Sequence, residues 1–397
     1  MSVTAPKGFV AAGVAAGFKR SGRLDLAVVA TADRRPVTAA AVFTTNLVAA
    51  APVLISRLNL AVDPRAAAVV LNSGNANAAT GRPGLEVATR TCDVAAASLG
   101  CVPNDVLVCS TGLIGIPMPF EPIERGLPEA LATLGDDAPS ARRAAEAIMT
   151  TDTVPKEATA TLSAGNGGTV TVGGMAKGAA MLSPSMATML AVLTTDAGVD
   201  PADLQRALSR ATEDTFNQLT TDSSRSTNDT VIALASGVAG PPLEGAQVHS
   251  LTDALIEVCA SLAGQMAADA EGATKLARIC VRGARSADDA RRAARAVAQS
   301  QLVKCSLYGE DPYWGRVLSE LGASGAFLEP DRVDIAYNGI TACRGGVAAD
   351  HDGAALAAAM KQREIDVVCD LHVGLGEALV TTVDLGPGYI DENKGTS

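Results

Sequence analysis

The chain has 397 residues, of which 48% are hydrophobic, so it is long enough for a substantial core in two domains or one large α/β domain. The formal net charge of −11 and the absence of a basic run argue against a nucleic-acid-binding protein. No apolar run is long enough to span a bilayer, and Lys7, Lys19 and Arg20 interrupt the early apolar stretches, so we expect neither a membrane segment nor a signal peptide.

The eight cysteines and three histidines do not have the spacing of a metal site. No pair of cysteines has CxxC spacing, and no HExxH sequence occurs. We therefore expect no metal, and we interpret most of the cysteines as reduced core residues of a cytoplasmic protein.

The first part of the chain alternates apolar, β-branched runs with alanine-rich helical patterns, which is typical of an α/β fold. The predicted elements are strands at Leu26–Ala30, Ala67–Asn72 and Val106–Cys109, and helices at Val87–Leu99 and Ala141–Met149. No internal repeat of fixed period interrupts this alternation.

The middle of the chain predicts a hairpin followed by a buried strand. Two short alternating strands, Ala158–Ser163 and Thr169–Gly173, flank Asn166-Gly167, a typical hairpin turn. An apolar run, Thr188–Thr195, then fits a strand buried on both faces. Pro184 precedes this run and disfavours a continuous helix or central strand there. Thr188 is therefore expected where a loop enters a buried strand.

The last part of the chain again predicts helices and strands. They are helices at Pro201–Asp214 (N-cap Asp200), Leu251–Ala268 and Ser286–Gln299 (N-cap Ser286), and strands at Ala277–Gly283, Val333–Tyr337 and Val367–Val373. The pattern changes near residue 278, so we predict a large domain over residues 1–278 and a smaller α/β domain over residues 279–397.

Thr188 has two interpretations: a structural residue at the start of a strand, or a catalytic nucleophile. A threonine hydroxyl is a weak nucleophile that needs a base, and a chain with so few histidines offers no convincing Ser/His/Asp arrangement. The α-amine of an N-terminal threonine is such a base, but it exists only if the Ala187–Thr188 peptide bond is broken. Because most threonines that enter strands are structural, the residues alone leave both readings open.

Several ordered sequence blocks resemble motifs of the ornithine acetyltransferase family, also called glutamate N-acetyltransferase. The segment around Thr188, KGAAMLSPSMATMLAVLTTDA, resembles the cleavage segment of that family. The other blocks are NSGNANAATG (Asn72–Gly81), CSTGLIG (Cys109–Gly115), IMTTDTVPK (Ile148–Lys156), STNDT (Ser226–Thr230), DAEGATK (Asp269–Lys275) and GEDPYWGR (Gly309–Arg316). Together these blocks extend over nearly the whole chain.

The resemblance implies an αββα fold of the N-terminal-nucleophile type with a smaller second domain. It implies self-cleavage between Ala187 and Thr188 into an α chain (residues 1–187) and a β chain (residues 188–397), which associate as α₂β₂. The implied reaction moves acetyl from N²-acetylornithine to glutamate through an acyl-Thr188 ester. No metal or bound organic cofactor is required, and the use of acetyl-CoA as another acetyl donor stays open.

The resemblance also implies roles for individual residues. Thr111 and Gly112 form the oxyanion hole, which must face the oxygen that becomes negative in the tetrahedral intermediate. Thr188 itself contacts substrate, and the other substrate-binding residues are Thr151, Lys177, Glu271, Asn393 and Ser397. Lys177 would hold a carboxylate, and Glu271 a cationic amine of ornithine. Without the resemblance, each of these residues has an ordinary structural interpretation. Thr111 and Gly112 would form a plain turn, and Thr151 would end a helix. Lys177 and Glu271 would be solvated surface charges, and Asn393 and Ser397 would belong to a frayed terminus.

The chain departs from the family pattern at a few positions. Ala270 replaces a glycine in DAEGATK, and Tyr313 stands where asparagine is usual. The stretch 223–225 (Ser-Ser-Arg) replaces a turn that usually contains glycine, and the tail after Asn393 is shorter and lacks an aromatic residue. None of these positions is Thr188, Thr111 or Gly112.

Two other functions are alternatives to the acetyltransferase: an aminopeptidase or amidohydrolase of the same fold, and an uncut, non-catalytic amino-acid-binding relative.

Overall fold

The computed structural model describes residues 2–163, 168–182 and 189–394, so Ala187, Thr188, Ser397 and the predicted Asn166-Gly167 turn lie outside the described residues. The chain divides into two compact units. Residues 1–217 and 225–266 form the first, and residues 218–224 and 267–396 form the second. Residue 278, where the sequence pattern changes, lies within a strand of the second unit, Leu276–Ala284.

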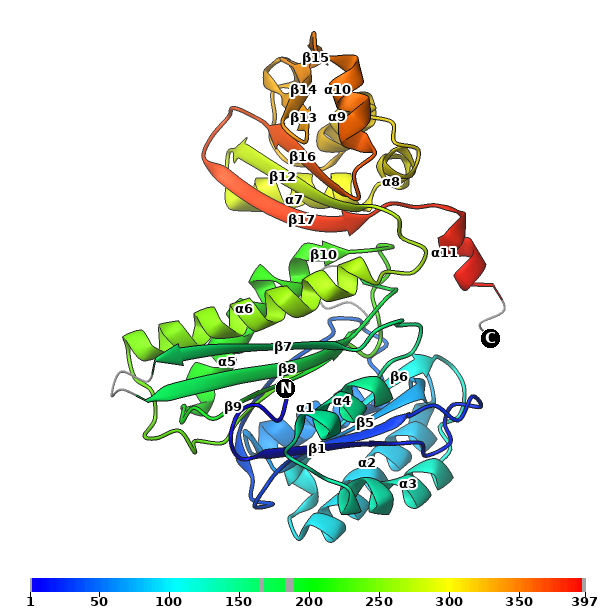
Figure 1. The fold of residues 1–397 in the computed structure, drawn as a ribbon, viewed down its shortest axis with the longest axis vertical. Helices are drawn as coiled ribbons and strands as arrows, with labels where there is room; N and C mark the ends of the chain where they lie inside the picture. Colours follow the sequence, from blue (N-terminus) through cyan, green and yellow to red (C-terminus); the bar gives the residue numbers. More distant parts are fainter. Residues whose placement is uncertain (1, 164–167, 183–188, 395–397) are drawn as a thin grey trace. The chain divides into compact units, whose positions relative to one another are not determined.

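The first unit contains two β-sheets (Figure 1). The first sheet has the order β1-β2-β5-β6, with β1 Phe9–Val14, β2 Leu26–Thr31, β5 Ala68–Asn75 and β6 Val106–Leu113. The second has the order β4-β3-β11-β9-β8-β7, with β4 Arg65–Ala66, β3 Val37–Phe43, β11 Thr230–Ala235, β9 Leu190–Thr195, β8 Thr169–Lys177 and β7 Lys156–Ser163. β9 is parallel to β11 and antiparallel to β8.

Most of the helices of this unit cover the outer faces of the two sheets, and Ala138–Ala147 packs on their facing sides. The helices are α1 Ala51–Val62, α2 Gly81–Leu99, α3 Glu121–Ala132, α4 Ala138–Ala147, α5 Pro201–Asp214 and α6 Ala246–Ala268. One apolar cluster joins α1, α2 and α3 to the first sheet, and a second joins the facing sides of both sheets together with α4. α5 packs on β3. On α6, Val258 and Leu262 lie so close to Gly174 of β8 that a Cβ there would meet them within about 3.1 Å. The predicted αββα architecture is therefore confirmed.

The second unit is built on one seven-stranded sheet. Its order is β10-β17-β12-β16-β13-β14-β15, with β10 Leu219–Thr220, β17 Gly376–Val383, β12 Leu276–Ala284, β16 Glu364–Asp370, β13 Asp334–Tyr337, β14 Ile340–Arg344 and β15 Val347–Ala348. The helices are α7 Ala287–Gln299, α8 Gln301–Tyr308, α9 Trp314–Ala323, α10 Gly353–Met360 and α11 Pro387–Glu392. α7 packs on β12 and β17 over the apolar core of this unit.

Most of the predicted elements are present, with shifted ends. Both predicted N-caps are confirmed, because Asp200 accepts the Ala202 N–H at 2.9 Å and Ser286 accepts the Asp289 N–H at 3.1 Å. The strand expected at Val367–Val373 instead runs from Glu364 to Asp370 as β16. Its first residues are polar but pair with Leu276 and its neighbours in β12, which extends the strand toward the N-terminus.

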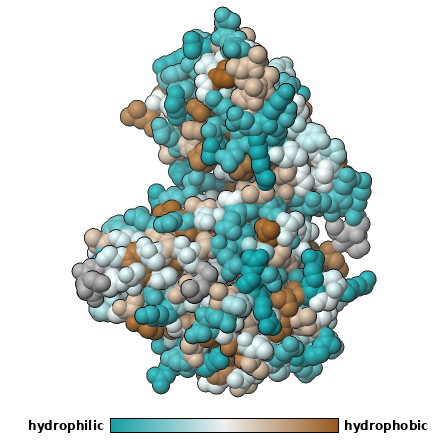
Figure 2. Space-filling model, viewed as in Figure 1, coloured by the Kyte–Doolittle hydropathy of each residue, from teal (hydrophilic) through white to brown (hydrophobic). Residues whose placement is uncertain are grey.

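The surface is mixed in polarity. On the face shown in Figure 2, apolar residues are scattered among hydrophilic ones. Among the residues that the structure describes, no helix is both long enough and apolar enough to cross a membrane.

Candidate active site

The segment after the predicted nucleophile is held at one end of the second sheet. Across β8, β9 and β11, Lys177 lies opposite Leu190, and Leu190 lies opposite Thr230. Leu190 begins β9 and follows Thr188 by two positions. In the sequence, the predicted Ala187–Thr188 bond therefore comes just before the residue of β9 that pairs with Lys177 and Thr230.

Met189, the first described residue after Thr188, is fixed by both of its backbone groups. Its N–H donates to Asp229 Oδ1 at 3.1 Å, and its carbonyl oxygen accepts the Thr230 N–H at 3.1 Å. Asp229 is fully buried, and its own carbonyl oxygen accepts the Thr44 N–H at 2.9 Å. The chain direction after Thr188 is therefore set by residues 229–230.

Lys177, the predicted carboxylate-binding lysine, belongs to a buried charged cluster rather than to a solvated surface. Asp152 lies between two ammonium groups, with Lys156 Nζ at 2.6 Å and Lys177 Nζ at 3.8 Å. Burial alone would raise the pKa of Asp152, but Lys177 and Lys156 outweigh it and hold that pKa well below its usual range. Asp152 also accepts the Gly178 N–H at 2.8 Å, which fixes the chain at the end of β8.

The cluster contains more positive than negative charge. Lys19, with its pKa lowered to about 8 mainly by burial, also lies within electrostatic reach of Asp152 and Lys177. Asp25, the strongest charged neighbour of Lys19, offsets the charge of that lysine. Lys156 and Lys177 still outnumber Asp152, and this excess of positive charge favours an anion such as a substrate carboxylate.

Thr151 is adjacent in sequence to Asp152 and is exposed. The helix before it, α4, ends at Ala147, so Thr151 does not close that helix. The Thr150 N–H donates to Asp152 Oδ2 at 2.9 Å, and this bond holds the loop that carries Thr151 beside the charged cluster. Thr151 and Lys177, two of the predicted substrate contacts, are thus positioned by the same carboxylate.

The predicted oxyanion pair, Thr111 and Gly112, lies inside β6. The predicted strand ended at Cys109, before this pair, so that predicted end was wrong. β6 continues to Leu113 because its pairing with β5 resumes past an irregularity at Gly74 and Asn75. Gly112 has a φ of 135°, and a Cβ at this position would meet the Gly74 carbonyl carbon at 2.4 Å. Only glycine fits this close approach of the two strands without a backbone shift.

A single dipeptide, Asn228-Asp229, connects this strand to Met189. Asn228 Nδ2 donates to the Ser110 carbonyl oxygen at 2.8 Å and to the Ala76 carbonyl oxygen at 2.6 Å. Ser110 directly precedes Thr111, while Asp229 holds Met189. The first and second sheets are therefore tied together between the predicted oxyanion pair and the segment that follows the predicted nucleophile.

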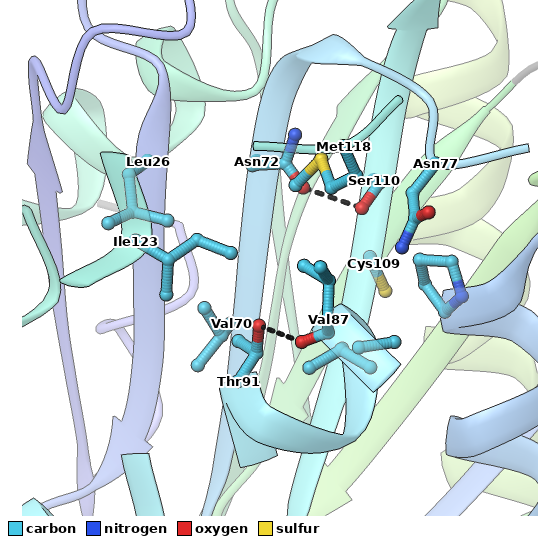
Figure 3. A pocket seen from close by; sticks show the side chains of 13 residues that line it. Leu26, Val70, Asn72, Asn77, Val87, Thr91, Cys109, Ser110, Met118 and Ile123 are labelled. Carbon is cyan, nitrogen blue, oxygen red and sulfur yellow. Dashed lines mark hydrogen bonds between the residues drawn. The ribbon is translucent and has the colours of Figure 1, made fainter. Parts of the chain in front are cut away.

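Between β5 and β6, the Ser110 hydroxyl donates to Asn72 Oδ1 at 2.5 Å (Figure 3). The apolar pocket around this bond, lined by residues such as Leu26, Val70 and Ile123, has a volume of only about 10 Å³. That is about the space of one water molecule, far below the hundreds of cubic ångströms of a ligand site. The pocket is therefore a packing feature beneath β5 and β6.

In the second unit, the structure brings together two other predicted site residues. Asn393 Nδ2 donates to Glu271 Oε2 at 2.8 Å, so residues 122 positions apart are joined. Glu271 is 9% exposed, so it is not the solvated helix-end glutamate of the alternative reading. Asn393 follows α11 and is itself exposed.

Three polar residues of the site were not singled out from the sequence: Asp152, Asn228 and Asp229. Each lies within a block that was recognised, IMTTDTVPK or STNDT, but had no assigned role. The available signal was a charged or amide side chain next to strands that are otherwise apolar. Such residues are rarely buried without partners, and each of these has them.

Comparisons with known proteins identify the family. The sequence profile of the ArgJ family matches residues 10–395. The chain belongs to the ArgJ family. An "Arginine biosynthesis bifunctional protein ArgJ" of Thermobifida fusca is 48% identical over 397 residues, which is 100% of both chains. A protein of the same name from Mycobacterium tuberculosis is 46% identical over 403 residues, covering 100% of this chain and 96% of the relative.

Solved structures of the family are also similar to this chain. The crystal structure of "Arginine biosynthesis bifunctional protein argJ" from Bacillus halodurans is 34% identical, covers 51% of this chain and 96% of its own, and has a TM-score of 0.49. An ornithine acetyltransferase complexed with ornithine, from Mycobacterium tuberculosis, is 41% identical, covers 48% of this chain and 96% of its own, and has a TM-score of 0.42. The family assignment made from the motifs is confirmed by the profile and the full-length relatives.

Proposed function

We propose that this ArgJ-family enzyme is a self-processing acetyltransferase of arginine biosynthesis, which moves acetyl from N²-acetylornithine to glutamate. The observation that carries the proposal is the Asn228-Asp229 junction. It joins the strand of Thr111 and Gly112, through Ser110, to the first residue after Thr188. An oxyanion hole and a nucleophile must share one site, and this junction brings their two chain segments together.

The reaction begins with the free α-amine that cleavage before Thr188 creates. This amine takes the proton of the Thr188 hydroxyl, which attacks the acetyl carbonyl of acetylornithine. Thr111 and Gly112 stabilise the oxyanion, by about 3 kcal/mol for each donor. Ornithine leaves, the acetyl group remains as an ester on Thr188, and the amine of glutamate then takes it as N-acetylglutamate.

In this proposal, a positively charged group binds the carboxylate of the substrate, and a negatively charged group binds its amine. The excess positive charge around Lys177 suits the α-carboxylate that both amino acids carry, with Thr151 beside it. Glu271, oriented by Asn393, suits the side-chain amine of ornithine. Ser397, which lies outside the described residues, completes the set that we propose for the substrate.

The test of this function is intact-mass measurement followed by a transfer assay. The purified protein is expected as two fragments, residues 1–187 and 188–397, with acetylornithine consumed only when glutamate is present. Thr188→Ala is expected to remain uncut and inactive. Normal turnover by that variant, or a full-length wild-type chain that stays uncut on incubation, would contradict the proposal.

The same assay separates the alternatives. Hydrolysis of acetylornithine without glutamate indicates an amidohydrolase or aminopeptidase of this fold. Ligand binding by an uncut, inactive chain indicates a non-catalytic relative. The word "bifunctional" in the names of the relatives favours acetyl-CoA as a second acetyl donor, which the assay tests by replacing acetylornithine with acetyl-CoA.

The proposal also covers assembly and location. We propose that the two fragments stay together as α₂β₂ in the cytoplasm, with no bound metal or organic cofactor. β9 begins the second fragment and lies between β8 of the first fragment and β11, so separating the fragments would break a continuous sheet. Native gel filtration with mass detection tests the assembly, cell fractionation tests the location, and elemental analysis tests for a metal.

A further inference from the structure

The carboxyl group of Asp229 has no role in the acetyl transfer proposed above, yet it is buried and its position is tightly fixed. Its side chain is fully buried, and Oδ1 accepts the Met189 N–H at 3.1 Å. Its other oxygen, Oδ2, is also buried and has no hydrogen-bond partner among the described residues. A buried carboxyl oxygen without a partner costs free energy, so its presence calls for a functional explanation.

Backbone contacts on both sides fix the position of this carboxyl group. The Asp229 carbonyl oxygen accepts the Thr44 N–H at 2.9 Å, and the next residue, Thr230, begins β11 and bonds to Met189. Asn228, the preceding residue, is bonded to the carbonyl oxygens of Ala76 and Ser110. The side chain of Asp229 therefore has little freedom to move away from Met189.

Covalent connectivity relates this carboxyl group to the bond that is predicted to break. The Met189 nitrogen is bonded to the carbonyl carbon of Thr188, and the nitrogen of Thr188 is two bonds beyond that carbon. Bond lengths alone keep the two nitrogens within roughly 4 Å of each other. Asp229 Oδ1, which is 3.1 Å from the Met189 nitrogen, therefore lies within roughly 7 Å of the nitrogen of the Ala187–Thr188 peptide bond.

We propose that the Asp229 carboxyl group carries the proton during self-cleavage of the Ala187–Thr188 bond, an inference that rests on the proposed function. In this step, a bond forms between Thr188 Oγ and the Ala187 carbonyl carbon, and the bond between that carbon and the Thr188 nitrogen breaks. Asp229 Oδ2–H donates its proton to the departing nitrogen, and the carboxylate takes the proton of the Thr188 hydroxyl.

The step balances without any other reactant. One proton has moved from oxygen to nitrogen, Asp229 is neutral before and after, and the product is an ester with a free amine. Water then hydrolyses the ester, which leaves the Ala187 carboxylate and restores the Thr188 hydroxyl.

The electrostatic surroundings of Asp229 support a neutral acid. Burial raises the pKa of its carboxyl group well above the usual value, more than the Met189 N–H, the Ser226 hydroxyl and the charge of Lys177 lower it. Lys177, the charged side chain that faces it, is itself 3.8 Å from the carboxylate of Asp152. Asp152 therefore offsets part of the positive charge that would otherwise ionise Asp229.

The decisive variant is Asp229→Asn, made in the full chain by cell-free synthesis and followed over time by intact mass. Asparagine keeps the shape and the oxygen that accepts the Met189 N–H, but its amide does not release a proton at neutral pH. We expect the fragments to form about 10²- to 10⁴-fold more slowly than in the wild type. Cleavage within about threefold of the wild-type rate would overturn the proposal.

Asp196→Asn is the matched control, because Asp196 is a buried carboxylate that follows the other end of β9 and accepts the Thr171 N–H at 2.8 Å. It should cleave like the wild type, and equal slowing in both variants would overturn the specific role of Asp229. Asp229→Ala is a further test, because it also removes the contact with Met189. If alanine slows cleavage and asparagine does not, Asp229 only positions Met189, and the proton-carrying role is wrong.

A measurement on the wild type keeps the proposal testable if the variants fold poorly. The rate of self-cleavage should fall at alkaline pH, as Asp229 loses its proton. A rate that rises steadily from about pH 6 to about pH 9 would instead indicate an external base and would overturn the proposal. Failure of the wild type to cleave at any pH would contradict the proposed function itself, which is a different outcome from normal cleavage by Asp229→Asn.

Discussion

Asp152 and Asp229 are both buried in the first unit, and Lys177 acts on both, yet the pKa values of their carboxyl groups shift in opposite directions. Asp152 has Lys156 at 2.6 Å and Lys177 at 3.8 Å, so two ammonium groups outweigh the effect of its burial. Asp229 accepts a hydrogen bond from the Met189 N–H, and its Oδ2 has no hydrogen-bond partner among the described residues. Lys177 influences it less directly. Burial alone therefore does not determine the charge of a carboxyl group at this site; the number of close ammonium groups does.

This contrast separates two tasks. An ionised Asp152 fixes Lys177 and the loop of Thr151 for substrate binding, and it has no proton to give. A neutral Asp229 holds Met189 and keeps a transferable proton near the predicted cleavage bond. If the comparison is right, removing the charge of Asp152 should damage the fold, whereas replacing the neutral carboxyl group of Asp229 by an amide should not.

The largest effect is expected from Asp152→Asn, which leaves Lys156 and Lys177 buried beside a neutral amide. We expect a loss of about 3–5 kcal/mol in the free energy of unfolding at neutral pH. Because the folded-state pKa of Asp152 is lowered, its stabilising contribution is present above the unfolded pKa of about 3.9 and is lost as the pH falls through the folded value. The difference between variant and wild type should therefore shrink below about pH 4.

The measurement is urea unfolding in a Thr188→Ala background, in which every variant is expected to remain one chain. Glu146→Gln serves as the control, because its ion pair with Arg142 is exposed and should contribute less than about 1 kcal/mol. Equal stability of Asp152→Asn and Glu146→Gln would show that the buried cluster is not held by this charge.

The second prediction concerns Asn228, which shares its loop with Asp229. Asn228→Ala leaves the carbonyl oxygens of Ser110 and Ala76 without their donor, and we expect a loss of about 1–3 kcal/mol in stability. Self-cleavage should also slow, because the same loop holds Asp229 on Met189.

Asn59→Ala is a matched control for the cleavage rate. Asn59 is a buried asparagine of α1 that lies beside the first residue of β6, because its Nδ2 donates to the Val106 carbonyl oxygen at 2.9 Å. Its loss should lower stability by a similar amount without slowing cleavage. If both variants cleave equally slowly, Asn228 affects cleavage only through the stability of the fold. A specific role of its loop at the cleavage site would then be wrong.

The third prediction concerns Glu271, a carboxylate whose hydrogen-bond partner, the amide of Asn393, is neutral. Glu271→Gln keeps an oxygen for the amide of Asn393 but loses the charge proposed for the ornithine amine. We expect the KM for acetylornithine to rise about tenfold, which corresponds to about 1.4 kcal/mol, and the KM for glutamate to stay unchanged. Glu392→Gln, a neighbouring glutamate that contacts the Gly272 N–H, is the control. A parallel rise in both KM values would argue against a role specific to ornithine.

The family resemblance implied the αββα architecture, while local periodicity and single side chains predicted most of the strands and the two N-caps. The sequence pattern placed Thr111 and Gly112 beyond the end of a strand, because the continued pairing of β6 with β5 past Gly74 is a contact between distant segments. The roles of Asp152 and Asp229 were out of reach for the same reason. Lys156, the nearer partner of Asp152, is only four residues away, but Lys177 lies 25 residues from Asp152 and Met189 lies 40 residues from Asp229. Local sequence patterns do not predict these longer-range contacts.

The smallest effect is expected for the stability of Asp229→Asn near pH 4, and the sign of its change at higher pH is the sharpest test of the comparison. Because the folded-state pKa of Asp229 is raised, its stabilising contribution is fully present below the unfolded pKa of about 3.9 and is lost as the pH rises toward the folded value. Asparagine does not titrate, so the variant should match the wild type near pH 4 and gain relative stability as the pH rises to about 7. Thermal unfolding at both pH values, in the Thr188→Ala background, measures this difference. A relative loss at the higher pH would mean that Asp229 is ionised in the folded chain, and the two buried carboxyl groups would then not differ in charge.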